Sequence, residues 1–210
     1  MAETEPTGRP RTRTDSAEAH IEVVPATADR WADVVTLLGA DGDRGCWCQS
    51  WRGADAAFGR SEPGTNRRRL EVQLASGDFA PGLIAYVDGE AAGWCGLGPR
   101  QAMPRLVNSR TIPAVDDLPV WSIGCFKIRV GYRRRGVATA LLAAAVDYAR
   151  SKGAPAIEGY PIDPGTDRVD VGFGFVGFTS MFEAQGFHRA AKTEAHSARR
   201  PRWLMRRDLA

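Results

Sequence analysis

Residues 120–150 read VWSIGCFKIRVGYRRRGVATALLAAAVDYAR, an apolar run followed by a basic turn and a second apolar run. The first run is rich in β-branched and aromatic side chains, which favours a buried strand. In the second run Val137, Leu141, Ala145 and Tyr148 recur at about the 3.6-residue period of an amphipathic helix. The stretch therefore predicts a strand, a turn and a helix in direct succession.

The turn between the two runs, GYRRRG at 131–136, has the properties of an anion-binding site. The first turn of a helix presents unpaired N–H groups at the positive end of the helix dipole. Three consecutive arginines add guanidinium groups that pair well with phosphate oxygens. Gly136 permits a tight turn and leaves no Cβ between the amides and a ligand. The turn predicts a pyrophosphate site, and the alternative is a solvated basic turn before a surface helix.

The pattern Arg133-x-x-Gly136-x-Ala138, between a strand and a helix, resembles the acyl-CoA-binding signature of the GNAT superfamily of N-acetyltransferases. The order of the expected elements extends this resemblance over about Ile21–Arg207. More narrowly, the chain resembles bacterial GNAT proteins that combine a CWC segment, an RRRG turn and a GYP strand, which stand here at 46–48, 133–136 and 159–161. The resemblance implies an α/β fold whose mixed, mostly antiparallel central sheet is splayed between its fourth and fifth strands and flanked by helices. It also implies that acetyl-CoA lies with its pantetheine arm in the slot between those strands and its pyrophosphate at the basic turn. The cofactor-binding residues carried over in this way are Ile128, Arg129, Val130, Arg133, Arg134, Arg135, Gly136, Val137, Ala138 and Thr139.

Composition limits the other classes of function. The chain has 210 residues with 43% hydrophobic and 25% charged side chains, which is ordinary for a globular protein. A net charge of +3 does not indicate a general nucleic-acid binder, and there is neither an apolar run of membrane length nor a secretory signal. Four cysteines without framework spacing indicate a reducing compartment, so a cytoplasmic location is expected. Residues 1–18 are expected to be a disordered tail, and residues 19–210 a single domain.

Patterning outside the central stretch predicts the remaining elements. Strands are expected at 20–25, 82–87, 91–97, 156–161, 187–190 and 202–207, and helices at about 31–38, 66–75 and 178–185. Thr27 or Asp29 is expected to cap the first helix. Residues 192–200 are polar and are expected to be mobile, whereas the strands near the C-terminus suggest a homodimer through a sheet edge.

Acetyl transfer to an amine needs a base for the amine, stabilisation of an oxyanion and departure of a thiolate. Glu158, on the strand expected to face the slot, is the candidate base, and the alternative is a structural carboxylate paired with an arginine. GNAT enzymes often protonate the thiolate with a tyrosine on the short helix, but Phe182 stands at the matching position. Ser180 or Thr179 is the hydroxyl group that could replace it, unless these residues only cap the helix.

Several aromatic and thiol side chains are expected at the acceptor end. Trp47, Trp94, Trp121 and Tyr160 are interpreted as lining an acceptor pocket, with core packing as the alternative. Cys46-x-Cys48 lacks a second pair of ligands at matching spacing, so no metal is expected and the two thiols are assigned to pocket lining or packing.

The sequence thus predicts an acyltransferase that moves the acetyl group of acetyl-CoA to a primary amine of a small molecule or protein by direct attack in a ternary complex. One alternative is a catalytically weak acyl-CoA-binding or sensor protein, since Phe182 replaces the tyrosine. Another is a nucleic-acid or phosphoprotein binder that uses the arginine clusters.

Overall fold

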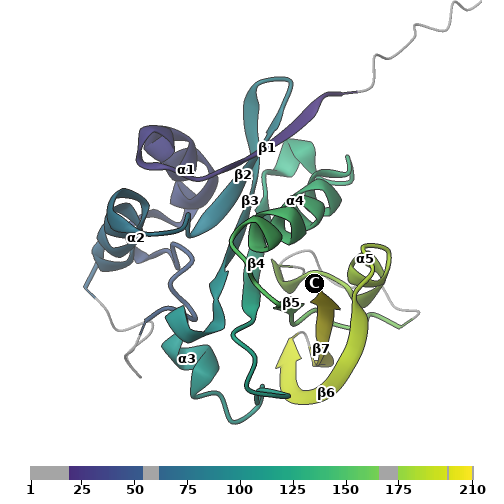
Figure 1. Ribbon diagram of the computed structural model, residues 1–210. Coiled ribbons are helices and arrows are strands. Elements are labelled where there is room, and N and C mark those ends of the chain that lie inside the picture. Colours follow the sequence, from purple (N-terminus) through teal and green to yellow (C-terminus); the bar gives the residue numbers. More distant parts are fainter. Residues whose placement is uncertain (1–18, 54–61, 166–174, 198, 210) are drawn as a thin grey trace, which may run out of the picture.

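The computed structural model describes residues 19–53, 62–165, 175–197 and 199–209 (Figure 1). The expected tail at residues 1–18 lies outside these ranges. The strands are β1 (Ile21–Pro25), β2 (Gly82–Val87), β3 (Glu90–Pro99), β4 (Trp121–Ile128), β5 (Ala156–Gly159), β6 (His188–Ser197) and β7 (Arg200–Asp208). The α-helices are α1 (Trp31–Leu38), α2 (Thr65–Ser76), α3 (Pro104–Val107), α4 (Val137–Ser151) and α5 (Thr179–Glu183). Short 3₁₀ turns are η1 (Ala28–Arg30), η2 (Gly39–Arg44), η3 (Arg100–Ala102) and η4 (Val130–Tyr132).

Within the described residues, the strands form one sheet in the order β1-β2-β3-β4-β5-β7-β6. Every neighbouring pair is antiparallel except β4 and β5, which are parallel because α4 connects them. The expected α/β fold with a mixed, mostly antiparallel sheet is therefore confirmed.

The sheet parts between β4 and β5. These two strands pair only at Trp121–Ile157, Ser122–Glu158 and Ile123–Gly159, whereas β4 stays paired with β3 as far as Ile128. The β3–β4 register shifts where Gly96 pairs with Cys125 and Leu97 pairs with Ile123, which leaves Gly124 as an extra residue in β4. A bulge of this kind bends a strand, so the bulge at Gly124 coincides with the point where the two strands diverge.

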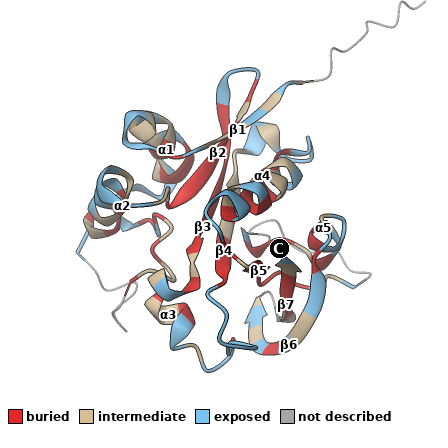
Figure 2. Cartoon of the chain, viewed as in Figure 1, coloured by how far each residue is buried: buried red, intermediate tan, exposed pale blue. Residues whose placement is uncertain are grey.

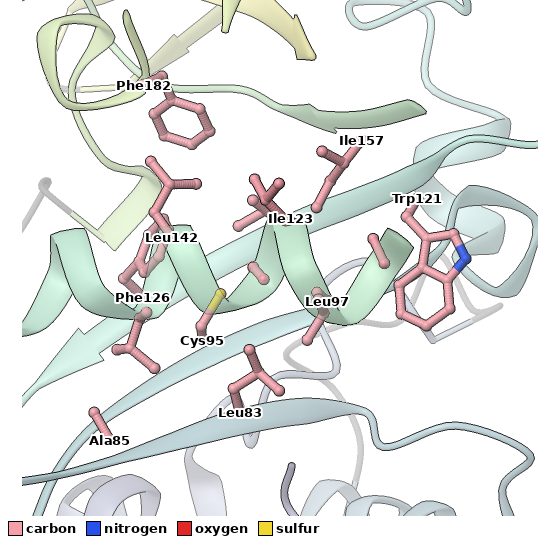
Figure 3. Packing of buried hydrophobic residues seen from close by; sticks show 14 of the residues in the cluster. Leu83, Ala85, Cys95, Leu97, Trp121, Ile123, Phe126, Leu142, Ile157 and Phe182 are labelled. Carbon is pink, nitrogen blue, oxygen red and sulfur yellow. The ribbon is translucent and has the colours of Figure 1, made fainter. Parts of the chain in front are cut away.

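Helix α4 packs on one face of the sheet, and α1 and α2 pack on the other (Figure 1). Side chains that alternate along the central strands meet α4 in a continuous cluster, with Phe182 and Trp121 toward its two ends (Figure 3). The opposite face of β2 and β3, with Ile84 and Trp94, packs against α1, α2 and Trp47. The central strands are accordingly buried while the outer faces of the helices are exposed (Figure 2). This packing fixes the position of β4 from both sides.

The prediction that residues 192–200 form a mobile polar segment is wrong. Strand β6 continues through Ser197 and pairs with β7, including Lys192 with Trp203 and His196 with Pro201. The hydroxyl of Thr193 is buried and donates to the backbone oxygen of Arg202 at 2.7 Å. Backbone pairing does not require apolar side chains, and charged residues are common on an edge strand such as β6.

The first helix also starts differently from the expectation. A 3₁₀ turn, η1, precedes α1, and Thr27 makes no side-chain capping bond to the backbone. Its hydroxyl oxygen instead accepts a hydrogen bond from the guanidinium of Arg30 at 2.7 Å. Among the described residues, no helix is both long enough and apolar enough to cross a membrane.

Candidate functional site

The turn between β4 and α4 leaves a row of backbone amides at the start of the helix. Gly136 precedes α4 with a φ of 81°, a left-handed conformation that glycine adopts without cost. The first hydrogen bond of the helix runs from the N–H of Ala140 to the oxygen of Gly136, at 3.0 Å. The N–H groups of residues 137–139 therefore lack acceptors within the helix, and Gly136 supplies no side-chain cap.

These amides border a cavity of about 190 Å³. Its lining residues are Ile128, Tyr132, Arg133, Arg134, Gly136, Val137, Ala138 and Thr139. All of these except Tyr132 belong to the set proposed from sequence, whereas Arg129, Val130 and Arg135 of that set lie outside the lining. Tyr132 was missed, although its place inside the basic turn was a signal that could have identified it.

The three arginines of the turn are exposed. Within the part of the chain that the structure describes, no carboxylate forms an ion pair with Arg133, Arg134 or Arg135. The Nε of Arg133 donates to the oxygen of Ile128 at 3.3 Å, and Arg135 lies over the ring of Tyr132. The cavity thus combines helix amides with free cations, which is the composition of an anion-binding site.

The open side of β4 leads into this cavity. The N–H of Arg129 donates to Ala92 on β3 at 2.9 Å. Because successive N–H groups of an extended chain alternate in direction, those of Ile128 and Val130 point to the side from which β5 has diverged. Val130 itself is 77% exposed. An extended ligand could therefore pair with this edge and continue into the cavity.

A model of the acetyltransferase (GNAT) family matches residues 49–162, more than half of the chain, including β4, the basic turn and α4. The chain belongs to the GNAT family of acetyltransferases. As a member it is an N-acetyltransferase that uses acetyl-CoA, and the family does not define its acceptor. The described cavity fits the cofactor, because its amides and arginines suit a pyrophosphate.

Solved structures share the fold at low sequence identity. An N-acetyltransferase from Staphylococcus aureus Mu50 is 10% identical, with coverage of 91% of this chain and 99% of that one, and a TM-score of 0.53. A GNAT acetyltransferase from Streptococcus pneumoniae is 14% identical, with coverage of 91% and 100% and a TM-score of 0.53. A putative acetyltransferase from Salmonella typhimurium, solved with its cofactor acetyl-CoA, is 12% identical, with coverage of 90% and 94% and a TM-score of 0.52.

The chain spans only 36% of the length of one GCN5-related N-acetyltransferase from Kribbella flavida. No curated protein sequence matches this chain.

The candidate base, Glu158, lies in a buried network on the face of the sheet opposite α4. It is 1% exposed, and its Oε2 lies 3.4 Å from Nη1 of Arg100 and accepts a hydrogen bond from the Tyr160 hydroxyl at 3.1 Å. Its Oε1 lies 3.8 Å from Nη1 of Arg206. Burial raises the pKa of Glu158, and the charge of Arg100 opposes that rise. These contacts match the alternative of a structural carboxylate paired with arginines, although the raised pKa also suits a base.

The network reaches β4 through hydroxyl groups. The Tyr160 hydroxyl lies 2.9 Å from the Ser122 hydroxyl, and Arg100 donates to it at 2.7 Å. Arg202, also buried, donates from Nε to the backbone oxygen of Tyr160. The arginines of β7 did not enter the sequence interpretation. Their spacing was a usable signal, because positions 202, 204 and 206 share one face of a strand and Leu204 marks that face as buried.

The hydroxyl candidates of α5 are placed unequally. Ser180 is exposed, and Thr179 is buried, where its hydroxyl oxygen accepts a weak hydrogen bond from Arg189 at 3.4 Å. Phe182 is fully buried against Phe126 and Phe187, and a Cβ at Gly159 would lie only 2.2 Å from its ring. Position 182 therefore lies beside the residue at which the β4–β5 pairing ends, and the ring there carries no proton donor.

The aromatic residues assigned to an acceptor pocket are all buried, with Trp47, Trp94, Trp121 and Tyr160 between 0% and 5% exposed. Trp47 stacks with Trp31, and Trp121 packs edge-on against Phe79 and Tyr148. These positions fit the core-packing alternative. Among the described residues, no group of three His, Cys, Asp or Glu side chains is arranged to hold a metal ion.

Proposed function

We propose that the protein transfers the acetyl group of acetyl-CoA to a primary amine of a small molecule or a protein by direct attack in a ternary complex. The observation that carries this proposal is the cavity at the start of α4, where helix amides without helical acceptors meet arginines that form no ion pair within the described residues. In this placement the amides of residues 137–139, with Arg133 and Arg134, hold the pyrophosphate. Ile128 and Val130 pair with the pantetheine arm along the open edge of β4, and Arg129 and Arg135 contribute positive charge nearby.

The bulge in β4 supports a place for the thioester. The strands diverge at Gly124, so the backbone N–H groups of Phe126 and Ile128, which alternate with those directed toward β3, are candidates for polarising the thioester carbonyl. A single preorganised donor of this kind contributes roughly 3 kcal/mol to an acyl transfer. The amine attacks the carbonyl carbon, the tetrahedral intermediate collapses, and the CoA thiolate leaves.

For the proton of the amine we propose Glu158 as the acceptor, through the Tyr160 and Ser122 hydroxyls that connect it to β4. A base with a raised pKa works best near that pKa, and such a base contributes about 10²–10⁴-fold. On the leaving side, Phe182 supplies no acid, and we propose that the thiolate leaves unprotonated, since a thiol pKa of about 8.5 permits it. Ser180 remains the hydroxyl candidate for this step, although its exposure does not favour it.

We propose a cytoplasmic bacterial enzyme with no nucleic-acid partner, because all four cysteines are free and the similar GNAT structures include bacterial proteins. The edge strand β6 supports a homodimer as a further proposal.

The test is to incubate the full chain with acetyl-CoA and a panel of amines, including polyamines, amino acids and peptides, and to measure the free CoA thiol released. Amine-dependent thiol release, with an acetylated product in the mass spectrum, is the expected result. Binding of CoA without amine-dependent release would favour the alternative of a weak acyl-CoA sensor, which Phe182 suggests. Absence of CoA binding up to millimolar concentration would overturn both.

A further inference from the structure

Two thiols from distant parts of the chain meet on the sheet face opposite α4. The Sγ of Cys48, in the loop after η2, lies 3.2 Å from the Sγ of Cys125 on β4, and 77 residues separate them in sequence. Both cysteines are free and half-buried. Gly96 of β3 makes room for the pair, because a Cβ there would lie 2.1 Å from the Cys48 sulfur. The loop thus seats one thiol directly against the other.

The surroundings favour a negative charge on Cys48. The guanidinium of Arg52 donates to the backbone oxygens of Pro81 and Leu97, and among the described residues no carboxylate pairs with it. The indole N–H of Trp94 is fully buried and has no hydrogen-bond partner in the described part of the chain. Its nitrogen and the Cys48 sulfur both lie over Gly96, where a Cβ would be 3.2 Å from the nitrogen and 2.1 Å from the sulfur. An anionic sulfur at Cys48 would be the counterpart of both groups.

The protonation of the pair follows from these contacts. The S–H of Cys125 donates to Cys48 and lowers the pKa of Cys48 to about 7, with further lowering by Arg52 and Trp94 against the effect of burial. The same hydrogen bond, with burial, raises the pKa of Cys125. Near neutral pH the shared proton therefore resides on Cys125, and Cys48 has the properties of a nucleophilic thiolate.

We propose that Cys48 and Cys125 are a peroxide-reactive thiol pair, in which Cys48 attacks a hydroperoxide and Cys125 then closes a disulfide. This inference does not rest on the acetyl-transfer reaction.

The chemistry balances in two steps. The Cys48 thiolate attacks the terminal oxygen of the hydroperoxide, the O–O bond breaks, and the departing alkoxide takes a proton and leaves as an alcohol, or as water from hydrogen peroxide. Cys48 is then a sulfenic acid. The Cys125 sulfur attacks the sulfur of Cys48, and the hydroxyl leaves as water with the proton of Cys125. Two thiols lose two electrons in total, and one hydroperoxide is reduced.

The bond would fasten the loop to the strand that carries the bulge. Cys125 directly follows Gly124, and Trp51 of the same loop packs over Gly124, where a Cβ would lie 3.2 Å from the indole ring. The disulfide would therefore hold this loop against β4 at the point where β4 and β5 diverge.

The other two cysteines provide internal controls. Cys46 is exposed as a residue, and its sulfur shares a hydrogen bond with the Ser50 hydroxyl. Desolvation of that sulfur by its neighbours, with the nearby Cys48, raises the pKa of Cys46. Cys95 is fully buried in the cluster beneath α4, and burial raises its pKa. Exposure alone would favour oxidation of Cys46, so the site of reaction separates the proposal from simple accessibility.

The experiment is to treat the full chain with hydrogen peroxide at pH 7 and to map the cysteine peptides without reduction. The expected result is loss of two thiols and a peptide pair joined through Cys48 and Cys125, formed equally in the double variant Cys46→Ser, Cys95→Ser. In Cys125→Ser, dimedone should label Cys48 as a sulfenic acid. A link through Cys46 or Cys95 would overturn the proposal.

The rate of oxidation of the wild-type chain supplies a second test that needs no variant. A thiol of pKa about 7 is half ionised at pH 7, against a few per cent for an ordinary thiol, so Cys48 should react roughly tenfold faster than the thiols of the urea-unfolded chain. The rate of Cys48 alkylation by iodoacetamide should rise with pH with a midpoint of about 7, and Cys125→Ala should move that midpoint upward. Oxidation of the native chain no faster than of the unfolded chain would contradict the proposal.

Discussion

The two ends of the β4–β5 divergence are built in opposite ways. At the cofactor end, helix amides and the exposed side chains of Arg133 and Arg134 surround an open cavity. At the expected acceptor end, Glu158 is buried between Arg100 and Arg206, and Arg206 also pairs with Asp116 at 2.6 Å. In the first region polar groups are available to a ligand, whereas in the second they are bonded to other groups of the protein. Substitutions at the cofactor end should therefore change ligand binding with little effect on stability, whereas those at the acceptor end should change stability and turnover together.

Gly136→Glu should have the largest effect and abolish CoA binding, with a loss of more than 100-fold. The substitution places a carboxylate at the cavity and a side chain at a φ of 81°. Isothermal titration with CoA measures the loss.

Gly153→Glu is the matched control, because Gly153 follows the other end of α4 with a φ of 73°. The left-handed conformation costs roughly 1–2 kcal/mol at either position. CoA affinity should stay within twofold in Gly153→Glu, and an equal loss in both variants would assign the effect to strain.

Glu158→Gln should reduce turnover about 100-fold and leave CoA affinity unchanged. The substitution removes the proposed base and the carboxylate that pairs with Arg100, whereas Arg206 keeps its ion pairs with Asp116 and Asp208. Loss of one partner of a buried pair costs on the order of 3 kcal/mol of stability. Steady-state rates against pH provide the measurement. In the wild type the rate should rise as pH increases through the raised pKa of Glu158, and this dependence should vanish in the variant.

Asp147→Asn is the control for Glu158→Gln, because Asp147 lies exposed on α4 and pairs there with Arg150. A variant Glu158→Gln that is destabilised yet keeps the wild-type pH profile would show that Glu158 is structural alone.

Arg133→Ala and Arg134→Ala should each weaken CoA binding about tenfold, since a hydrogen bond to a charged group contributes about 1.5 kcal/mol at the low end. Their melting temperatures should not change, because these side chains are exposed. Arg150→Ala, in the last turn of the same helix, should leave affinity unchanged. The difference in CoA affinity between the wild type and each variant should shrink at high salt, and a difference that stays the same would contradict an electrostatic role.

Ser180→Ala should have the smallest effect, with turnover within twofold of the wild type, because Ser180 is exposed on α5. Phe182→Tyr should raise turnover below pH 8, because the tyrosine hydroxyl would supply a proton donor beside Gly159 for the departing thiolate. Single-turnover thiol release measures both. A tenfold loss in Ser180→Ala would make Ser180 the acid.

The difference between the two ends also explains what could be predicted from sequence. The strand, turn and helix at 120–151 are local, so a continuous stretch was sufficient to predict them. The cofactor site proposed there uses backbone amides and adjacent arginines of the same stretch. The network of Glu158 is made by long-range contacts, with Arg100 58 residues away and Ser122 38 residues from Tyr160. Spacing along the chain carries no record of such contacts.

Two sequence interpretations differ from the contacts in the structure. Strand β6 is polar because it lies at the sheet edge, and its backbone pairing with β7 was invisible in its side chains. The tryptophans near the loops were interpreted partly as pocket walls, yet Trp94 and Trp47 fill the space between the sheet and α1. The meeting of Cys48 with Cys125 likewise required the register of β3 and β4 to be known.

The central claim is that CoA is held by the amides at the start of α4. Backbone amide chemical shifts recorded during a titration with CoA test this most directly. The account predicts the largest changes at residues 136–139, with further changes at Ile128 and Val130 and small ones at Glu158 and Tyr160. Unchanged amides at 136–139, with the main perturbation at the buried network or on another face, would contradict it.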